Sequence, residues 1–228
     1  MSSPLSSDSA HPPTGAGLRF QYVAVDGPIG VGKTTLVELL TRRFDGVKML
    51  EDVNNPFLGD FYEDRPGVAF QTELYFLLSR YKQQREITQR GLFDKTLISD
   101  YTFQKNRIFA YLNLSDDELA LFDKLYALLE PQIPIPDLVI HLVADVGVCM
   151  DRIRKRGRVI EKSISEEYLA ELIDAYNHYY HYYARSPLLV VDTRHLNFPQ
   201  RPEDFDELLH RLAKPIRGTE YFQPLGSR

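Results

Sequence analysis

The sequence predicts an α/β fold in which a parallel sheet of about five strands is covered by helices on both faces. Short apolar runs alternate with amphipathic segments along most of the 228 residues. Most of these runs are continuous rather than alternating, as expected of strands buried on both faces. A glycine-rich loop also joins the first run to the first amphipathic segment. The five expected strands are residues 22–26, 47–51, 95–100, 137–143 and 188–192.

Apolar residues at helical spacing predict helices between these strands. From Phe70 to Tyr81 they recur at intervals of three and four, within a long helix over residues 66–90 that Gly91 is placed to end. Ser115 with Glu118 forms a capping box and begins the second of two helices over residues 101–130. A further helix is expected after the glycine-rich loop, where Leu36, Leu39 and Leu40 have helical spacing. Others are expected through residues 150–153 into the basic segment, over residues 169–183 and over residues 202–212, and the tyrosines of residues 169–183 are expected to serve packing.

Length and composition predict one cytosolic domain with a small-molecule partner. Residues 1–18 are rich in Ser, Pro and Gly and predict a flexible tail, so the domain spans residues 19–214 and residues 215–228 form a second tail. The net charge of −5 argues against a nucleic-acid polymer as partner. A single cysteine, Cys149, excludes an intrachain disulfide. We expect no membrane partner, because apolar runs are short and the first residues do not resemble a signal peptide.

Residues 27–34, GPIGVGKT, have the spacing of a phosphate-binding loop between a strand and a helix. The glycines allow successive backbone N–H groups to surround a phosphate. Lys33 would bind the β and γ phosphates of ATP, and the Thr34 hydroxyl would bind Mg²⁺. The alternative is a glycine-rich turn that binds no ligand. The loop spacing, the Lys-Thr pair and the flanking strand and helix all favour phosphate binding instead. The expected ATP-binding residues here are Gly27, Gly30, Val31, Gly32, Lys33, Thr34 and Thr35.

Two carboxylates follow neighbouring strands of the expected sheet. Glu51 ends the second strand and Asp100 ends the third. Ligands of open parallel sheets gather at the carboxyl ends of the strands, and adjacent strands lie only about 5 Å apart. One carboxylate would be the general base and the other a Mg²⁺ ligand. Both could instead be structural caps of the following turn or helix.

A basic segment, residues 152–159, is the fourth part of the expected site. Arg152 and Arg156 are four residues apart and share a helix face, and Arg158 follows Gly157, where the helix can open into a loop. Such a run is often a solvated face. Beside a phosphate loop, it favours an arginine lid over residues 154–166 that stabilises the transferred phosphoryl group.

These residues together resemble the deoxynucleoside kinases, relatives of the nucleoside monophosphate kinases. The resemblance covers residues 22–212 and is most specific in GPIGVGKTT, in Glu51, in RIRKRGRVIEKSISEEYL and in VVDTRHLNF. It implies a three-layer P-loop kinase fold, ATP with Mg²⁺, and a homodimer. It implies that Glu51 takes the proton of the nucleoside 5′-OH, and that Tyr62 and Glu161 hold the sugar 3′-OH.

The same resemblance implies further roles. The lid arginines would be Arg152, Arg156 and Arg158, while residues 192–198, with Leu196, would pass near the adenine of ATP. Arg80 would lie close to the nucleoside base. One departure concerns the acid-Arg-Ser triplet usual after the third strand, which here reads Asp100-Tyr101-Thr102. Lys105 or Arg107 could supply the missing positive charge.

A second departure concerns the residues that read the base. The position of the family's glutamine falls on Glu73, with Gln71 nearby, and Asn106 stands where an aspartate is common. Helical geometry allows only one of Gln71 and Glu73 to face the pocket, and we favour Glu73. An ionised Glu73 accepts two hydrogen bonds and matches N1–H and N2–H₂ of guanine, with Asn106 donating to the base and Arg80 holding Glu73 ionised. Alternatively, Glu73 pairs with Arg80 while Gln71 reads the base.

The sequence therefore predicts an ATP-dependent deoxynucleoside kinase of nucleotide salvage that prefers deoxyguanosine to deoxyadenosine. A nucleoside monophosphate kinase is the nearest alternative, but its anionic acceptor needs several arginines in the acceptor pocket, and residues 54–80 offer only Arg65 and Arg80. The lost arginine after Asp100 motivates another alternative, a partner subunit that binds nucleotides without turnover.

Overall fold

The computed structural model describes residues 19–89 and 95–223, an α/β molecule with one six-stranded sheet. Its strands are β1 (Tyr22–Asp26), β2 (Val47–Met49), β3 (Leu97–Ser99), β4 (Leu138–Val143), β5 (Leu188–Asp192) and β6 (Thr219–Phe222). Its helices are α1 (Lys33–Phe44), α2 (Leu58–Tyr62), α3 (Ala69–Gln89), α4 (Lys105–Asn113), α5 (Asp116–Leu129), α6 (Val146–Arg156), α7 (Glu166–His181) and α8 (Pro202–Leu212), with 3₁₀ turns η2 (Glu130–Gln132) and η3 (Val159–Glu161).

The sheet is parallel throughout, with strand order β2-β3-β1-β4-β5-β6. β1, which precedes the glycine-rich loop, is central and buried along its whole length. β2 pairs with β3 so that Met49 lies opposite Ser99. The residues that follow them, Glu51 and Asp100, therefore leave the same edge of the sheet next to one another.

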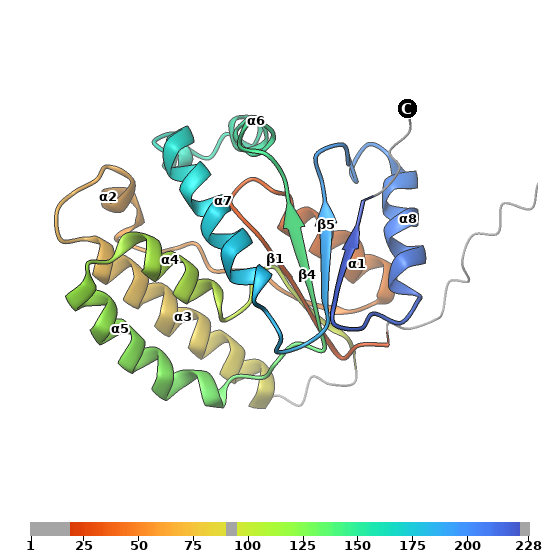
Figure 1. Cartoon of the computed structure of the whole chain (residues 1–228), viewed down its shortest axis with the longest axis horizontal. Coiled ribbons are helices and arrows are strands. Elements are labelled where there is room, and N and C mark those ends of the chain that lie inside the picture. The colour runs from red at the N-terminus through yellow and green to blue at the C-terminus, as the bar shows by residue number, and fades with distance from the viewer. Residues whose placement is uncertain (1–18, 90–94, 224–228) are drawn as a thin grey trace, which may run out of the picture.

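Helices cover both faces of the sheet, as the sequence predicts. Figure 1 shows α1 and α8 on one side of the strands and α3, α4, α5 and α7 on the other. Apolar side chains of β1, β4 and β5 form the core with residues of these layers, including Tyr176 and Tyr180 of α7. The prediction that the α7 tyrosines serve packing is confirmed for these two. The capping box of Ser115 and Glu118 is also present at the start of α5.

The sheet has one strand more than the sequence predicts. Residues 219–222 form β6, which pairs in parallel with β5, so the expected tail from residue 215 contains part of the sheet. β6 was missed because it is a four-residue edge strand with alternately exposed side chains, not a continuous apolar run. The short helix α2 was also missed. The other expected tail, residues 1–18, and the helix-ending Gly91 lie outside the described residues.

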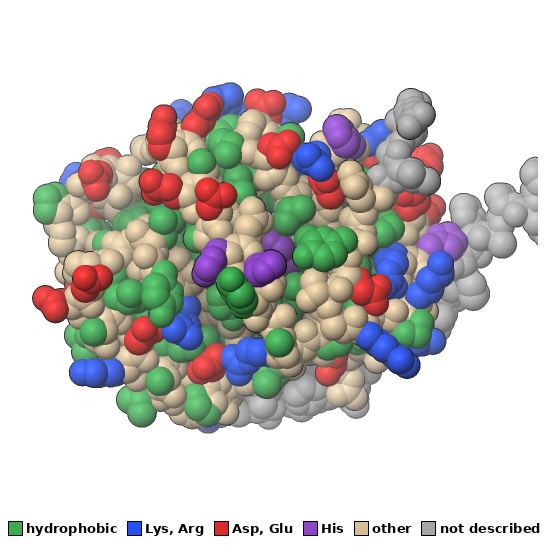
Figure 2. Space-filling model, viewed as in Figure 1, with side chains coloured by type: hydrophobic (Ala, Val, Ile, Leu, Met, Phe, Trp, Pro, Cys, Tyr) green, Lys and Arg blue, Asp and Glu red, His purple; other side chains and the backbone are tan. Residues whose placement is uncertain are grey.

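The surface in Figure 2 carries acidic and basic side chains interspersed over one face. Within residues 19–89 and 95–223, no helix is long and apolar enough to cross a membrane.

Candidate active site

Two glycines of the loop after β1 combine a left-handed backbone with a lack of space for any side chain. Gly27 has φ 146° and Gly30 has φ 82°. A Cβ atom would lie 2.5 Å from Leu142 O at Gly27 and 2.5 Å from Cys149 O at Gly30. Any larger residue would therefore displace the backbone of β4 or α6 against which the loop packs.

Lys33 folds back over this loop, where its Nζ donates hydrogen bonds to Gly27 O and Pro28 O, both at 2.8 Å. Burial, followed by the charge of Lys105, lowers the pKa of Lys33 to about 8. In the described structure no side chain caps the first turn of α1, and no acidic residue lies in it. Its free N–H groups and Lys33 make this end of α1 suitable for binding phosphate.

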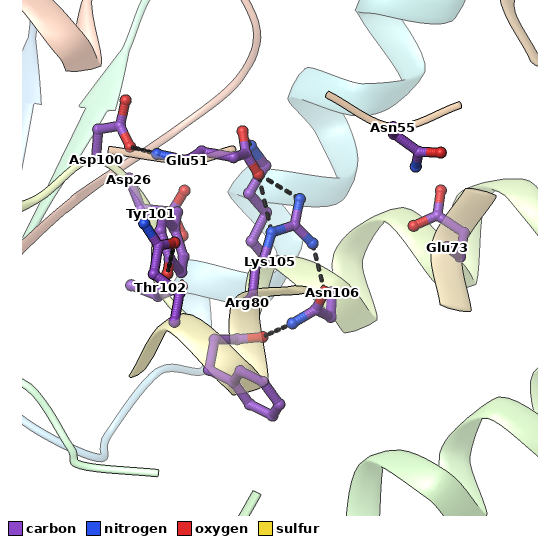
Figure 3. A network of polar contacts seen from close by, with 12 residues as sticks. Asp26, Glu51, Asn55, Glu73, Arg80, Asp100, Tyr101, Thr102, Lys105 and Asn106 are labelled. Atoms are coloured by element: carbon purple, nitrogen blue, oxygen red, sulfur yellow. Dashed lines mark hydrogen bonds and ion pairs between the residues drawn. The ribbon is translucent and has the colours of Figure 1, made fainter. Parts of the chain in front are cut away.

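Asp100 connects the loop helix to Glu51. Its Oδ2 accepts a hydrogen bond from Thr34 Oγ1 at 2.8 Å, and its Oδ1 accepts one from the backbone N–H of Glu51 at 2.7 Å. Glu51 and Asp100 are therefore neighbours, as predicted, and their carboxylates have different hydrogen-bond partners (Figure 3).

Two cations surround the carboxylate of Glu51. Lys105 Nζ lies 2.6 Å from Oε2, and the guanidinium of Arg80 binds Oε1. Burial alone would raise the pKa of Glu51, but the charges of Lys105 and Arg80 and their hydrogen bonds hold it well below its usual range. Glu51 is therefore ionised at neutral pH and fixed in orientation.

Lys105, and not Arg107, supplies the charge that the missing arginine would bring. Arg107 is directed away and pairs with Asp123 at 3.4 Å. Tyr101, at the place of the missing arginine, is fully buried and donates a hydrogen bond to Gln83 at 2.6 Å. The charge thus reaches Glu51 from α4, one helical turn further along the chain.

One cavity of about 950 Å³ joins the phosphate loop to these residues. It extends to Tyr62 of α2 and to Glu73 and Arg80 of α3. On the other side it extends to residues 193–200, where Leu196 contributes to its wall. All the predicted site residues of the loop, except Gly27, line it, as do Thr35 and both carboxylates.

Two predicted substrate residues do not line this cavity. Gln71 lies on the exposed side of α3, because a separation of two residues turns it about 200° around the helix from Glu73. Asn106 is fully buried behind the wall, where its Oδ1 accepts from Arg80 and its Nδ2 donates to Phe103 O at 2.8 Å. Asn106 thus orients Arg80, and one of its two amide N–H groups is used by Phe103 O behind the cavity wall.

Glu73 lies in the cavity wall, and no basic side chain of residues 19–86 or 95–223 forms an ion pair with it. Asn113 Nδ2 donates to its Oε1 at 2.7 Å, while Arg80 is bound to Glu51 and Asn106. The alternative prediction, in which Glu73 pairs with Arg80 at the helix edge, is therefore wrong. Figure 3 shows Glu73 apart from the Glu51 cluster.

The predicted lid arginines line the cavity with their side chains held by neighbours. Arg156 forms a two-pronged ion pair with Glu161, with Nη2 at 2.7 Å from Oε1 and Nε at 3.0 Å from Oε2. Arg158 approaches the same carboxylate at 3.5 Å. Arg152 donates to Val31 O at 2.9 Å and to Thr193 O at 2.8 Å, which ties the phosphate loop to residues 193–196.

A buried network under the loop was not predicted. Asp26, at the end of β1, is fully buried and accepts hydrogen bonds from Gly27 N at 2.8 Å, Thr102 Oγ1 at 2.5 Å and Tyr180 OH at 2.7 Å. An acid directly before the glycine loop is visible in the sequence and could have indicated this network. Its partners could not be identified, because Thr102 and Tyr180 are 76 and 154 residues away.

A phosphate loop that opens into the same cavity as a fixed, ionised carboxylate defines a P-loop phosphotransferase. A family model described as deoxynucleoside kinase matches residues 23–217. The chain therefore belongs to the deoxynucleoside kinase family. It is a kinase that transfers a phosphoryl group from a nucleotide donor to the 5′-OH of a nucleoside.

Individual relatives agree with this family. The chain is 39% identical over 158 residues to a deoxyguanosine kinase of Bacillus subtilis, a match that covers 68% of this chain and 76% of the relative. It is 36% identical over 162 residues to a deoxyadenosine kinase of Dictyostelium discoideum, covering 69% and 66%. A structure of deoxyadenosine kinase from M. mycoides with bound dATP has the same fold, with a TM-score of 0.75, 24% identity and coverage of 85% and 100%.

Proposed function

We propose that this protein transfers the γ-phosphoryl group of ATP to the 5′-OH of a purine deoxyribonucleoside, deoxyguanosine ahead of deoxyadenosine, in nucleotide salvage. The observation that carries this proposal is the position of Glu51, which lies in one cavity between the phosphate loop and Glu73. A nucleoside that lay along this cavity would present its 5′-OH to Glu51 and its base to Glu73.

Glu51 is the proposed general base. Its carboxylate is ionised, and Lys105 and Arg80 fix its orientation. In a loose phosphoryl-transfer transition state the acceptor proton leaves late, so an oriented carboxylate of low basicity can hold the 5′-OH and receive its proton. The same two cations make Glu51 less suited to be the Mg²⁺ ligand that the sequence also allowed.

Thr34 and Asp100 are the proposed Mg²⁺ ligands. Their oxygen atoms lie 2.8 Å apart beside the uncapped start of α1. Mg²⁺ in nucleotide sites is held by one or two such groups together with substrate phosphates, so a full set of protein ligands is not needed. When bound, the ion would neutralise charge on the β and γ phosphates of ATP.

Arg156 and Arg158 are proposed to bind the transferred phosphoryl group, and Glu161 with Tyr62 the sugar 3′-OH. The ion pairs of both arginines with Glu161 support a coupled role, because movement of the arginines toward phosphate also changes the carboxylate that faces the sugar. Arg152 and Leu196 are proposed to lie beside ATP, where Arg152 holds residues 193–196 against the loop.

Glu73 is the proposed base-reading residue. Its ionised carboxylate accepts from the N1–H and N2–H₂ groups of guanine, whereas adenine offers only its amino group. The names of the relatives, a deoxyguanosine kinase and a deoxyadenosine kinase, support a purine substrate. The family likeness also suggests a cytosolic location and a homodimer. Sedimentation of the purified protein tests the homodimer.

An ADP-release assay with four deoxynucleosides, and with deoxyguanosine and thymidine monophosphates, tests this function. We expect deoxyguanosine to have the highest kcat/KM and the monophosphates to be inert. Turnover of a monophosphate alone would favour the nucleoside monophosphate kinase alternative. Binding of ATP without turnover of any acceptor would favour the inactive partner subunit.

A further inference from the structure

We propose that Glu73 selects the nucleoside base according to its own protonation: the ionised carboxylate accepts guanine, and the protonated carboxyl group accepts adenine or cytosine. This inference rests on the proposed function and deepens it. It makes the base preference of the enzyme a function of pH rather than a fixed property of the pocket.

The hydrogen-bonding state of Glu73 leaves Oε2 without a partner and Oε1 with a second lone pair, so both oxygens can meet the base. The side chain is 2% exposed and lines the cavity from α3. Asn113 Nδ2 donates to Oε1 at 2.7 Å, while Oε2 is buried and no other described residue forms a hydrogen bond with it. A buried polar atom without a partner costs folding free energy, so Oε2 is suited to a ligand group.

The amide of Asn113 also decides which oxygen carries the proton. Because Nδ2 donates to Oε1, that oxygen remains an acceptor, and a proton on the carboxyl group belongs on Oε2. Glu73 thus presents two acceptors when ionised, and a donor at Oε2 beside an acceptor at Oε1 when protonated.

These two states match different bases. Two acceptors match N1–H beside N2–H₂ of guanine, while a donor beside an acceptor matches N1 with N6–H₂ of adenine or N3 with N4–H₂ of cytosine. The wrong state places a lone pair against a lone pair inside a buried site, which discriminates strongly.

The groups around Glu73 allow both states near neutrality. Arg80 of α3 and Lys105 of α4 are the nearby cations, but both are bound to Glu51. Tyr62 of α2 and Tyr168 of α7 face Glu73, and burial raises the pKa of both phenols above their usual range. The pKa of Glu51 is held low, so these three neighbours keep their charge state between about pH 6 and about pH 8.

The balance of these groups brings the titration of Glu73 into the physiological range. Burial raises its pKa, and the hydrogen bond from Asn113 and the charge of Arg80 lower it, to about 7 in sum. Both forms are then populated in the free enzyme under ordinary assay conditions.

The pH dependence of a selectivity ratio tests the proposal. The ratio of kcat/KM for deoxyguanosine to kcat/KM for deoxyadenosine should rise about tenfold per pH unit between about pH 6 and about pH 8. Because the ratio is taken at each pH, titration of Lys33 or of ATP affects both substrates equally. In Glu73→Gln the ratio should be lower and independent of pH. Gln71→Glu, an exposed acid on the same helix, is the matched control and should keep the wild-type slope.

Proton exchange on binding gives a second readout that needs no turnover. Titration calorimetry in two buffers of different ionisation enthalpy should show uptake of about half a proton with deoxyadenosine and release of about half a proton with deoxyguanosine near pH 7, because about half of the free enzyme is protonated there. A pH-independent ratio together with no proton exchange would overturn the inference while leaving the kinase activity intact. If no deoxynucleoside is phosphorylated at any pH, the proposed function fails, and calorimetry alone still decides whether Glu73 binds the bases as described.

Discussion

Lys105 Nζ lies 2.6 Å from Glu51 Oε2, where Lys105 is buried and Glu51 is 14% exposed toward the cavity. Lys105 is the first residue of α4, whereas Glu51 follows β2, so this pair fixes the carboxylate from a second element in addition to Arg80 of α3. The relationship explains how the site keeps two cations on Glu51 although Tyr101 stands where the family resemblance implies an arginine.

Lys105 should therefore be a positioning residue. We expect Lys105→Met to lower kcat by about 10²-fold, because a carboxylate displaced by roughly 1 Å loses its alignment with the 5′-OH. Lys105→Arg should retain most of the activity, since it restores a cation at the same place. Arg107→Met is the control, because Arg107 pairs with Asp123 outside the cavity. Equal loss of activity in Arg107→Met and Lys105→Met would contradict this role.

Glu51→Gln should lower kcat by about 10²- to 10⁴-fold with little change in nucleoside affinity. The amide keeps the shape of the side chain but cannot receive the 5′-OH proton. The substitution also leaves Arg80 and Lys105 without their buried counter-charge, which destabilises the fold by about 3 kcal/mol or more. Kinetics must therefore be measured at a temperature where circular dichroism shows a folded variant. Near wild-type kcat in such a sample would return the role of base to Asp100.

The pH dependence of wild-type kcat/KM should show no acid limb from Glu51 above about pH 5, because Lys105 and Arg80 hold its pKa below the usual range. Because its pKa is lowered, Glu51 is already fully ionised above about pH 5. In Lys105→Met, burial should dominate and bring an acid limb toward neutrality. Identical pH profiles of wild type and Lys105→Met would show that Lys105 does not control Glu51.

Each part of the site that could be predicted from the sequence lies within a single short segment. The loop spacing, the strands before Glu51 and Asp100, and the identity of the arginine segment all lie within short windows, where residue type and periodicity carry the information. The strand order then brought the two carboxylates together.

The rest depended on contacts between distant segments. The choice between Lys105 and Arg107 rests on which side of α4 faces Glu51, and the pairing of Asp26 with Tyr180 spans 154 residues. Helical geometry showed only that one of Gln71 and Glu73 can face the pocket, and the partner of Glu73, Asn113, is 40 residues away on α4. Contacts between residues so far apart in the chain cannot be recognised from residue spacing in a single sequence.

Arg156→Ala and Arg158→Ala should each lower kcat by about 10³-fold while ATP still binds. Both side chains line the cavity, and the phosphoryl group would replace Glu161 as their partner. Arg154→Ala is the matched control, since Arg154 is exposed and pairs with Asp151 and Glu166. Unchanged turnover in both variants, with ATP binding measured by calorimetry, would make this segment a solvated face.

Glu73 should also make stability depend on pH. Burial raises its pKa from 4.5 to about 7, so the folded protein binds this proton more tightly than the unfolded chain does. The stability that Glu73 contributes is therefore complete below about pH 4.5 and is lost as the pH rises through about 7. Glu73→Gln carries no titrating group and keeps an oxygen for Asn113. Between about pH 5 and about pH 8 the free energy of unfolding of wild type should fall relative to that of Glu73→Gln by about 2.5 kcal/mol. Urea unfolding of both proteins at the two pH values measures this difference, and Gln71→Glu, exposed on the same helix, should show none. A constant difference between wild type and Glu73→Gln would mean that Glu73 titrates as an ordinary carboxyl group.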